Sequence, residues 1–311
     1  MLKPRCRLES NRREFLQILL GGAAGVTVTW RVYGQGGGPG SITVTKITDR
    51  ISALSGAGGN VGLVVGPDGM LMVDGGTANR APDLAGAIAQ ISPRMVQVLF
   101  NTHYHGDHVG SNEFLGKNKV RIIAHENVRK RLGERFDNAA FGRVFEPLAP
   151  IGHPTETFGD GGKLLFGQEA LEYTHIPLAH TDGDAYVFFP NANVLHTGDL
   201  LFLGRYPVVD FSARGSLAGM AAALERMDRV GDAQTRVIAG HGGPVTTKAE
   251  MRVAREMWLS INQRLEEHAK SGQSLDEVVK AAPTRDFDSK LGVSDPSGFV
   301  RQAYGGVLAA R

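Results

Sequence analysis

The chain has almost no cysteine, since Cys6 is the only one among 311 residues. Beyond position 6 the chain therefore cannot form an internal disulfide or a thiolate metal site. Any metal ion in the body of the protein must be held by histidine and carboxylate side chains. Hydrophobic residues make up 42% and charged residues 21%, so a sizeable core can be buried.

The body of the chain also lacks an excess of positive charge. The net charge of +2 depends on the first 33 residues, which carry six Lys/Arg and two acids. The remaining residues contain 28 bases and 30 acids, a net charge of −2. Because this leaves no global basic field, we expect no nucleic-acid partner.

Paired arginines near the N-terminus indicate export. Arg12 and Arg13 precede a polar residue, Phe and Leu, which resembles the twin-arginine motif. The uncharged run that follows, over residues 15–30, is shorter than the ~20 apolar residues that span a bilayer. We interpret residues 1–34 as a removable twin-arginine signal peptide and 35–41 as a glycine-rich linker. This predicts that the twin-arginine export machinery handles the precursor and that the mature protein is periplasmic or secreted.

Hydrophobic periodicity predicts two halves, each built of strands and helices. Strands are predicted over residues 42–47, 61–65, 70–73, 96–100, 120–124, 163–166, 170–176, 185–189, 193–196 and 236–239. Helices are predicted over residues 82–90, 126–132, 216–230, 248–270, 275–281 and 297–309, and a proline-containing loop follows residue 132. This order suggests an α/β (α+β) fold, a four-layer αββα sandwich over residues 42–247. Residues 248–311 are then a C-terminal helical extension packed on it.

A dense cluster of candidate metal ligands, His103-Tyr104-His105-Gly106-Asp107-His108, comes directly after a predicted buried strand. A loop at a strand end can gather side chains around one point, and neutral imidazoles and carboxylates suit zinc. Four ligands within six residues cannot all reach one tetrahedral ion from a single loop. His103 and His105 can point to one ion, while Asp107 and His108 point to a second.

Three further candidates also follow predicted strands. His180 comes after the strand that ends at residue 176, and Asp199 after the strand that ends at residue 196. His241 lies in Gly240-His241-Gly242, at the end of another apolar run. The neighbouring glycines allow the backbone to come close to a bound ion.

The ordered set of His-x-His-x-Asp-His, a later His, Gly-Asp and Gly-His-Gly resembles the metallo-β-lactamase superfamily over about residues 42–245. This resemblance implies an αββα sandwich with two zinc ions per chain at one edge. It implies that the first zinc is held by His103, His105 and His180. It implies that the second is held by Asp107, His108 and His241. Asp199 would bridge the two ions, and Asp74, in Val73-Asp74-Gly75-Gly76, would orient a ligand histidine from behind.

The resemblance further implies a hydrolase that uses a metal-bound hydroxide, with Asp107 able to orient that hydroxide as a catalytic group. The sequence has no Gly-x-Ser-x-Gly elbow, so a serine nucleophile is not expected. Tyr104, Tyr206 and Phe211 are candidates for lining the substrate pocket, with simple packing as the alternative for Tyr206, which lies in Gly204-Arg205-Tyr206-Pro207.

Several small-molecule substrates remain open at this point: an ester, a thioester, a lactone or a lactam. A lactamase branch that places cysteine at the second zinc is disfavoured, because Asp199 stands in that position. Thioesterases resembling glyoxalase II carry a basic helical domain, whereas the helical tail here is shorter and lacks an evident basic cluster. A different class of function is also open, a non-catalytic zinc-binding module in an exported cofactor or redox pathway.

The paired arginines lead to a first test. Changing Arg12 and Arg13 together to lysine should leave the precursor in the cytoplasm, because the export pathway reads the arginine pair and not its charge. Cell fractionation with detection of precursor and mature forms measures this. Normal export of the double variant would show that another route, or none, is used.

Overall fold

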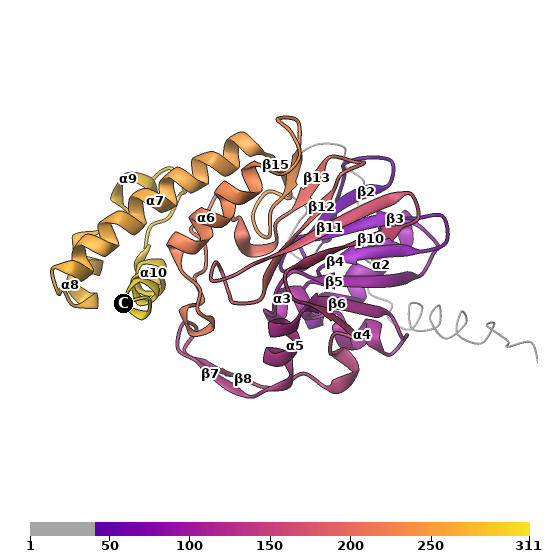
Figure 1. Ribbon diagram of the computed structural model, residues 1–311, viewed down its shortest axis with the longest axis horizontal. Coiled ribbons are helices and arrows are strands. Elements are labelled where there is room, and N and C mark those ends of the chain that lie inside the picture. The colour runs from indigo at the N-terminus through magenta and orange to yellow at the C-terminus, as the bar shows by residue number, and fades with distance from the viewer. Residues whose placement is uncertain (1–40) are drawn as a thin grey trace, which may run out of the picture.

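Two β-sheets lie face to face, and helices cover both outer faces (Figure 1). The computed structural model describes residues 41–311. This layering confirms the predicted α/β fold class and αββα arrangement. The predicted signal peptide, and the predicted linker up to residue 40, lie outside the described residues. Within residues 41–311, no helix is long and apolar enough to cross a membrane.

The first sheet has seven strands in the order β1-β2-β3-β4-β5-β6-β9. Neighbours are antiparallel from β1 to β4 and parallel from β4 to β9. The strands are β1 (Thr43–Lys46), β2 (Ile51–Ser55), β3 (Val61–Val65), β4 (Met70–Val73), β5 (Val96–Asn101), β6 (Arg121–His125) and β9 (Glu156–Phe158). The parallel half brings the carboxyl ends of β4 and β5 to the same edge of the sheet.

The second sheet has six strands in the order β10-β11-β12-β13-β14-β15, and its one parallel pair is β13 with β14. The strands are β10 (Gly161–Phe166), β11 (Glu169–Ile176), β12 (Asp184–Phe189), β13 (Val194–His196), β14 (Arg236–Ile238) and β15 (Val245–Thr247). A separate two-stranded hairpin joins β7 (Phe136–Asn138) to β8 (Arg143–Phe145).

The helices lie on the outer faces of the two sheets, and the last four follow one another at the C-terminus. The α-helices are α2 (Ala81–Ile91), α3 (Gly106–Val109), α4 (Asn112–Gly116), α5 (Glu126–Gly133), α6 (Leu217–Asp228), α7 (Lys248–Lys270), α8 (Leu275–Ala281), α9 (Arg285–Asp288) and α10 (Ser297–Ala309). Short 3-10 helices are η1 (Ala78–Arg80), η2 (Pro150–Gly152), η3 (Gly198–Leu200) and η4 (Phe211–Ala213). Apolar residues of α2 and α4 pack on the first sheet, and those of α6, α7, α8 and α10 share one core with the second sheet.

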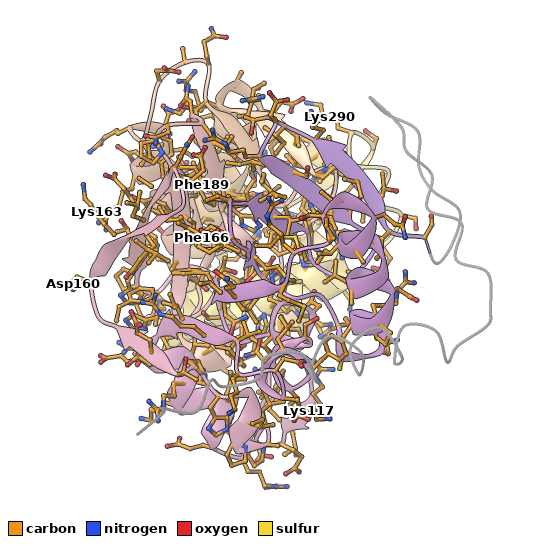
Figure 2. The ribbon with its side chains drawn as sticks, turned by 90° about the vertical axis from the view of Figure 1, so that its right-hand side faces the viewer. Lys117, Asp160, Lys163, Phe166, Phe189 and Lys290 are labelled. Atoms are coloured by element: carbon orange, nitrogen blue, oxygen red, sulfur yellow. The ribbon has the colours of Figure 1, made fainter. Side chains whose placement is uncertain are left out.

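Strand alternation sorts side chains between these layers. On β12, Val187 and Phe189 face the core between the sheets, while Tyr186 and Phe188 face the helices. Figure 2 shows Phe166 and Phe189 inside the molecule and Lys163 at its surface. Because β12 is buried on both faces, its sequence is a nearly continuous apolar run and does not alternate.

The loop predicted after residue 132 is not loop throughout. It contains the β7–β8 hairpin, the short strand β9 and η2. These strands have three residues each, too few to show a period of two in the sequence. The hairpin matters because it lies beside the candidate site described below.

The core shared by α6 and α7 leads to a stability test. Trp258 on α7 is fully buried in that core, so Trp258→Ala should lower the free energy of unfolding by about 3–5 kcal/mol. Val253 on the same helix is 70% exposed, and Val253→Ala should change it by less than about 0.5 kcal/mol. Denaturant titration measures both. Equal effects of the two substitutions would contradict this assignment of the core.

Candidate metal centre

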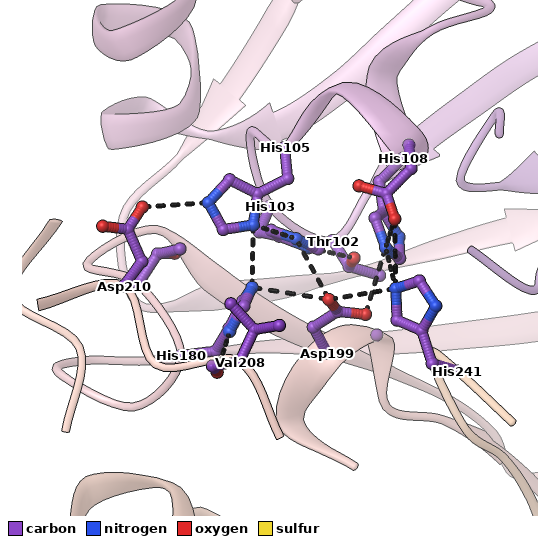
Figure 3. Close-up of polar contacts among 12 residues, drawn as sticks. Thr102, His103, His105, His108, His180, Asp199, Val208, Asp210 and His241 are labelled. Atoms are coloured by element: carbon purple, nitrogen blue, oxygen red, sulfur yellow. Dashed lines mark hydrogen bonds and ion pairs between the residues drawn. The ribbon is translucent and has the colours of Figure 1, made fainter. Parts of the chain in front are cut away.

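The predicted ligand residues meet at one edge of the sandwich, where strands of both sheets end (Figure 3). His103 and His105 follow β5, and Asp107 and His108 lie in α3. From the second sheet come His180 after β11, Asp199 in η3 after β13, and His241 after β14. The ligand atoms form two groups: His103, His105, His180 and Asp199 in the first, and Asp107, His108 and His241 in the second.

The first group is almost closed to water. Nδ1 of His105 lies 3.1 Å from Nε2 of His103 and 2.8 Å from Nε2 of His180. Oδ2 of Asp199 lies 3.4 Å from Nε2 of His180 and 3.8 Å from Nε2 of His103. None of the four side chains is more than 6% exposed. Burial lowers the pKa of all three histidines and favours neutral rings, the form that binds metal.

Hydrogen bonds on the outer side of two of these rings fix their tautomers. Nδ1 of His180 lies 2.9 Å from the carbonyl oxygen of Val208, which can only accept, so Nδ1 donates. Nε2 of His105 lies 2.9 Å from Oδ2 of Asp210 and donates to that carboxylate. The inner nitrogens of both neutral rings therefore carry lone pairs, and these lone pairs face each other.

Asp74 fixes the other side of the site. Its carboxylate accepts hydrogen bonds from the backbone N–H and the hydroxyl of Thr102, each at 2.8 Å, and from Nδ1 of His108 at 2.8 Å. Because the hydroxyl proton of Thr102 goes to Asp74, its oxygen accepts from Nδ1 of His103 at 3.1 Å. The lone pair of His103 thus also points inward. The structure places Asp74 behind His108, one of the candidate ligand histidines.

The second group balances negative and positive charge. Burial works to lower the pKa of His108, but the charges of Asp199, Asp74 and Asp107 outweigh it and raise that pKa well above its usual value. Burial also opposes the shift of His241, whose pKa Asp199 and Asp107 raise to about 9. These carboxylates therefore draw positive charge into the site, as protons on imidazoles or as a metal ion that displaces them.

Asp199 joins the two groups. Its Oδ2, which lies 3.4 Å from Nε2 of His180 in the first group, is also 3.3 Å from Nε2 of His241 in the second. Its Oδ1 lies 3.0 Å from Nε2 of His108. Asp107 completes the second group, with Oδ2 3.1 Å from Nε2 of His241. Burial alone would raise the pKa of Asp199. The neighbouring His108 and His241 have the larger, opposite effect and hold this pKa well below its usual value, so the carboxylate is ionised.

The chemistry of these side chains fits a metal ion. The lone pairs of three histidines and the ionised carboxylate of Asp199 point to one place. No proton lies between the facing nitrogens of His105 and His180, because the N–H group of each ring points outward. Ligand atoms on a zinc tetrahedron lie roughly 3.3 Å apart, and the separations in the first group run from 2.8 to 3.8 Å. Histidine and carboxylate are ligands that zinc accepts.

One buried carboxylate of the site, that of Asp210, was not predicted from the sequence. Asp210 accepts hydrogen bonds from His105, from the hydroxyl of Tyr104 and from Nδ2 of Asn138 on β7. It ends the apolar run Pro207-Val208-Val209, the same kind of signal that marked Asp199, but no glycine stands beside it. The carbonyl of Val208 leaves no signal in the sequence, because every residue has one.

Two of the three expected pocket residues have other roles. Tyr104 is 2% exposed, and its hydroxyl donates to Asp210. Tyr206 stacks on Phe299 with ring centroids 4.5 Å apart, and its hydroxyl donates to Asp288 at 2.6 Å. Both are therefore packed, hydrogen-bonded residues and not walls of an open pocket.

Comparison with known proteins gives a family match over much of the chain. Residues 54–241 match the model of the metallo-beta-lactamase superfamily. A hydroxyacylglutathione hydrolase of Thermosynechococcus vestitus is 28% identical over 146 residues, 47% of this chain and 49% of the relative. A hydroxyacylglutathione hydrolase of Brucella anthropi is 30% identical over 125 residues, 39% of this chain and 40% of the relative. The matches thus span about half the length of these relatives or less.

Solved structures show the same fold at lower identity. A metallo-beta-lactamase from Pontibacter korlensis has a TM-score of 0.59 and 19% identity, covering 70% of this chain and 99% of that chain. The stereoselective inverting sec-alkylsulfatase Pisa1 from Pseudomonas sp. has a TM-score of 0.62 and 16% identity, covering 85% of this chain and 49% of that chain.

The contact of Asp210 with His105 leads to a test of metal affinity. Asp210→Asn should weaken metal binding by about 10- to 100-fold, because the amide is uncharged and no longer holds the ring as strongly. Competition with a chelator of known affinity measures this, and circular dichroism checks the fold. The control is Asp137→Asn, an exposed carboxylate on the same hairpin as Asn138. Equal metal affinity in the two variants would mean that Asp210 does not position His105.

Proposed function

The chain belongs to the metallo-β-lactamase superfamily, and on that premise we propose that it is a binuclear zinc-dependent hydrolase acting on a small molecule. The bond cleaved is an ester, thioester, lactone or lactam. The observation that carries the proposal is the pair of ligand groups that share Asp199. A carboxylate between two groups of histidines offsets the repulsion of two dications.

Each side chain has a distinct part in this proposal. One zinc ion is held by His103, His105 and His180, the other by Asp107, His108 and His241, and Asp199 lies between them. When bound, zinc lowers the pKa of a coordinated water to about 7 and polarises the oxygen of the scissile bond. Asp74, Asp210 and Val208 hold three of the ligand rings in the required tautomer.

Asp107 is the best candidate for orienting the attacking water. Its side chain is 31% exposed, more than Asp199 at 4% or His241 at 15%. Substrate and water therefore reach the site on the side of Asp107. Burial works to raise its pKa, but His108 and His241 outweigh this and lower it, so the carboxylate is ionised and can orient water by accepting a hydrogen bond from it.

Two further observations support parts of this proposal. The names of the relatives, hydroxyacylglutathione hydrolases, favour a thioester among the open bonds. Arg12 and Arg13, which lie outside the described residues, favour export by the twin-arginine machinery to the periplasm or beyond the cell.

Elemental analysis and a substrate panel test the proposal together. The full chain, loaded with zinc, should contain close to two zinc ions and should hydrolyse at least one of a thioester, a lactone, a lactam and an aryl ester. Absence of tightly bound metal would overturn the proposal. Two metal ions without turnover on any substrate would instead favour a non-catalytic zinc-binding module.

The shared position of Asp199 leads to a specific prediction. Asp199→Asn keeps the size of the side chain and removes its charge. The second metal should be lost more readily than the first, because three histidines still hold the first ion. Turnover should fall by at least about 100-fold while the circular dichroism spectrum is retained. Metal stoichiometry and turnover are measured on the same sample, and two metals with wild-type turnover would show that Asp199 is not a ligand.

A further inference from the structure

The β7–β8 hairpin forms an aromatic wall next to the first ligand group. The ring of Phe141, at the tip of the hairpin, meets the ring of His105 edge to face, with centroids 5.2 Å apart. Phe145 lies 6.3 Å from the same imidazole and 6.0 Å from Phe141. Both phenylalanines are only half-buried. An apolar surface is therefore presented to solvent directly beside a candidate metal ligand.

The hairpin is held in this position from both sides. Asn138 on β7 donates to Asp210 at 2.9 Å. The backbone N–H of Ala140 donates to the hydroxyl of Ser212 at 3.1 Å, and Gln302 on α10 donates to the carbonyl of Ala140 at 3.0 Å. These hydrogen bonds fix the position of the aromatic wall relative to the ligand histidines. Residues that select a substrate need such a fixed position.

The space in front of this wall is open. Gly106 lies between His105 and Asp107 and is exposed. Apart from its two chain neighbours and the nearby backbone of α3, no atom among residues 41–311 lies within 4 Å of the position that a Cβ at Gly106 would take. A substrate can therefore approach the ligand groups between α3 and the hairpin.

Arg143 supplies a positive charge on the same wall. Its guanidinium carbon lies 5.3 Å from the ring centroid of Phe141 and 4.7 Å from that of Phe145. Stacking on two rings orients the guanidinium and leaves its N–H groups able to donate. Arg135 pairs with Glu146 and Arg131 with Asp182, whereas Arg143 has no ion pair in the part of the chain that the structure describes.

We propose that Arg143, Phe141 and Phe145 form a specificity subsite for a carboxylate on the substrate, with the aliphatic chain beside that carboxylate packed on the two rings. The proposal rests on the proposed hydrolase function and narrows its substrate class to small acyl compounds that carry a carboxylate away from the scissile bond. A planar guanidinium with free N–H groups matches a carboxylate in shape and charge. The faces of the two phenylalanine rings supply an apolar contact for the substrate's aliphatic segment, which lies between its carboxylate and its scissile bond.

A matched pair of substrates tests this subsite. One is a glutaric acid derivative with a free terminal carboxylate, the other the same compound with that carboxylate methylated. Both carry the acyl bond that the substrate panel shows to be cleaved. The wild-type chain should prefer the charged compound in kcat/KM. Arg143→Gln should reduce this preference about fivefold, mainly through KM, because one charge contact is lost.

The control variant is Arg135→Gln, which removes the arginine directly before β7, whose charge is already paired with Glu146. It should leave the preference unchanged, and added salt should weaken the preference of the wild-type chain. The subsite is ruled out if the wild-type chain does not distinguish the two compounds, or if both arginine variants lower the preference equally. It is also ruled out if Arg143→Gln slows both compounds by the same factor, the result of a purely structural role. Failure of every compound in the panel would count against the hydrolase proposal itself.

Discussion

Three neutral imidazoles turn their lone pairs toward one another in a site nearly closed to water, and this crowding is the constraint on which the rest of the structure depends. His105 and His180 approach to 2.8 Å with no proton between them, because their outer nitrogens donate elsewhere. Buried polar atoms without partners are costly. Such an arrangement is favourable only when a cation lies among the rings, so the geometry is that of a metal centre prepared by the fold.

The fold maintains this crowding by ending rigid strands at one place. Asp74, directly after β4, has a left-handed backbone with φ of 66°, which is strained for a residue other than glycine. It also accepts three buried hydrogen bonds, two from Thr102 and one from His108. Strain of this kind persists where the surroundings over-determine the conformation. Asp210 does the corresponding work for His105 from the second half of the chain.

The C-terminal helices contribute more than packing. Gln302 on α10 donates to Ala140 in the hairpin and accepts from the backbone N–H of Val209. Val209 lies between Val208 and Asp210, whose oxygens orient two of the ligand histidines. One side chain of the helical extension therefore ties the wall beside the site to the loop behind it. The C-terminal helices contribute no candidate metal ligand, but through Gln302 they help to fix the position of the hairpin beside the site.

The sequence by itself determined the kinds of ligand, their order along the chain and most secondary structure. The absence of cysteine beyond Cys6 excluded thiolate ligands in the body of the protein. Long periodic segments such as α7 have the predicted bounds, because periodicity and end signals are local. Tertiary structure alone decided that Asp210, 105 residues beyond His105, is its partner. It also decided that the carbonyl of Val208 fixes a tautomer and that a hairpin stands beside the site. Contacts between distant segments, backbone carbonyls and three-residue strands leave no local pattern, so only the packed chain reveals them.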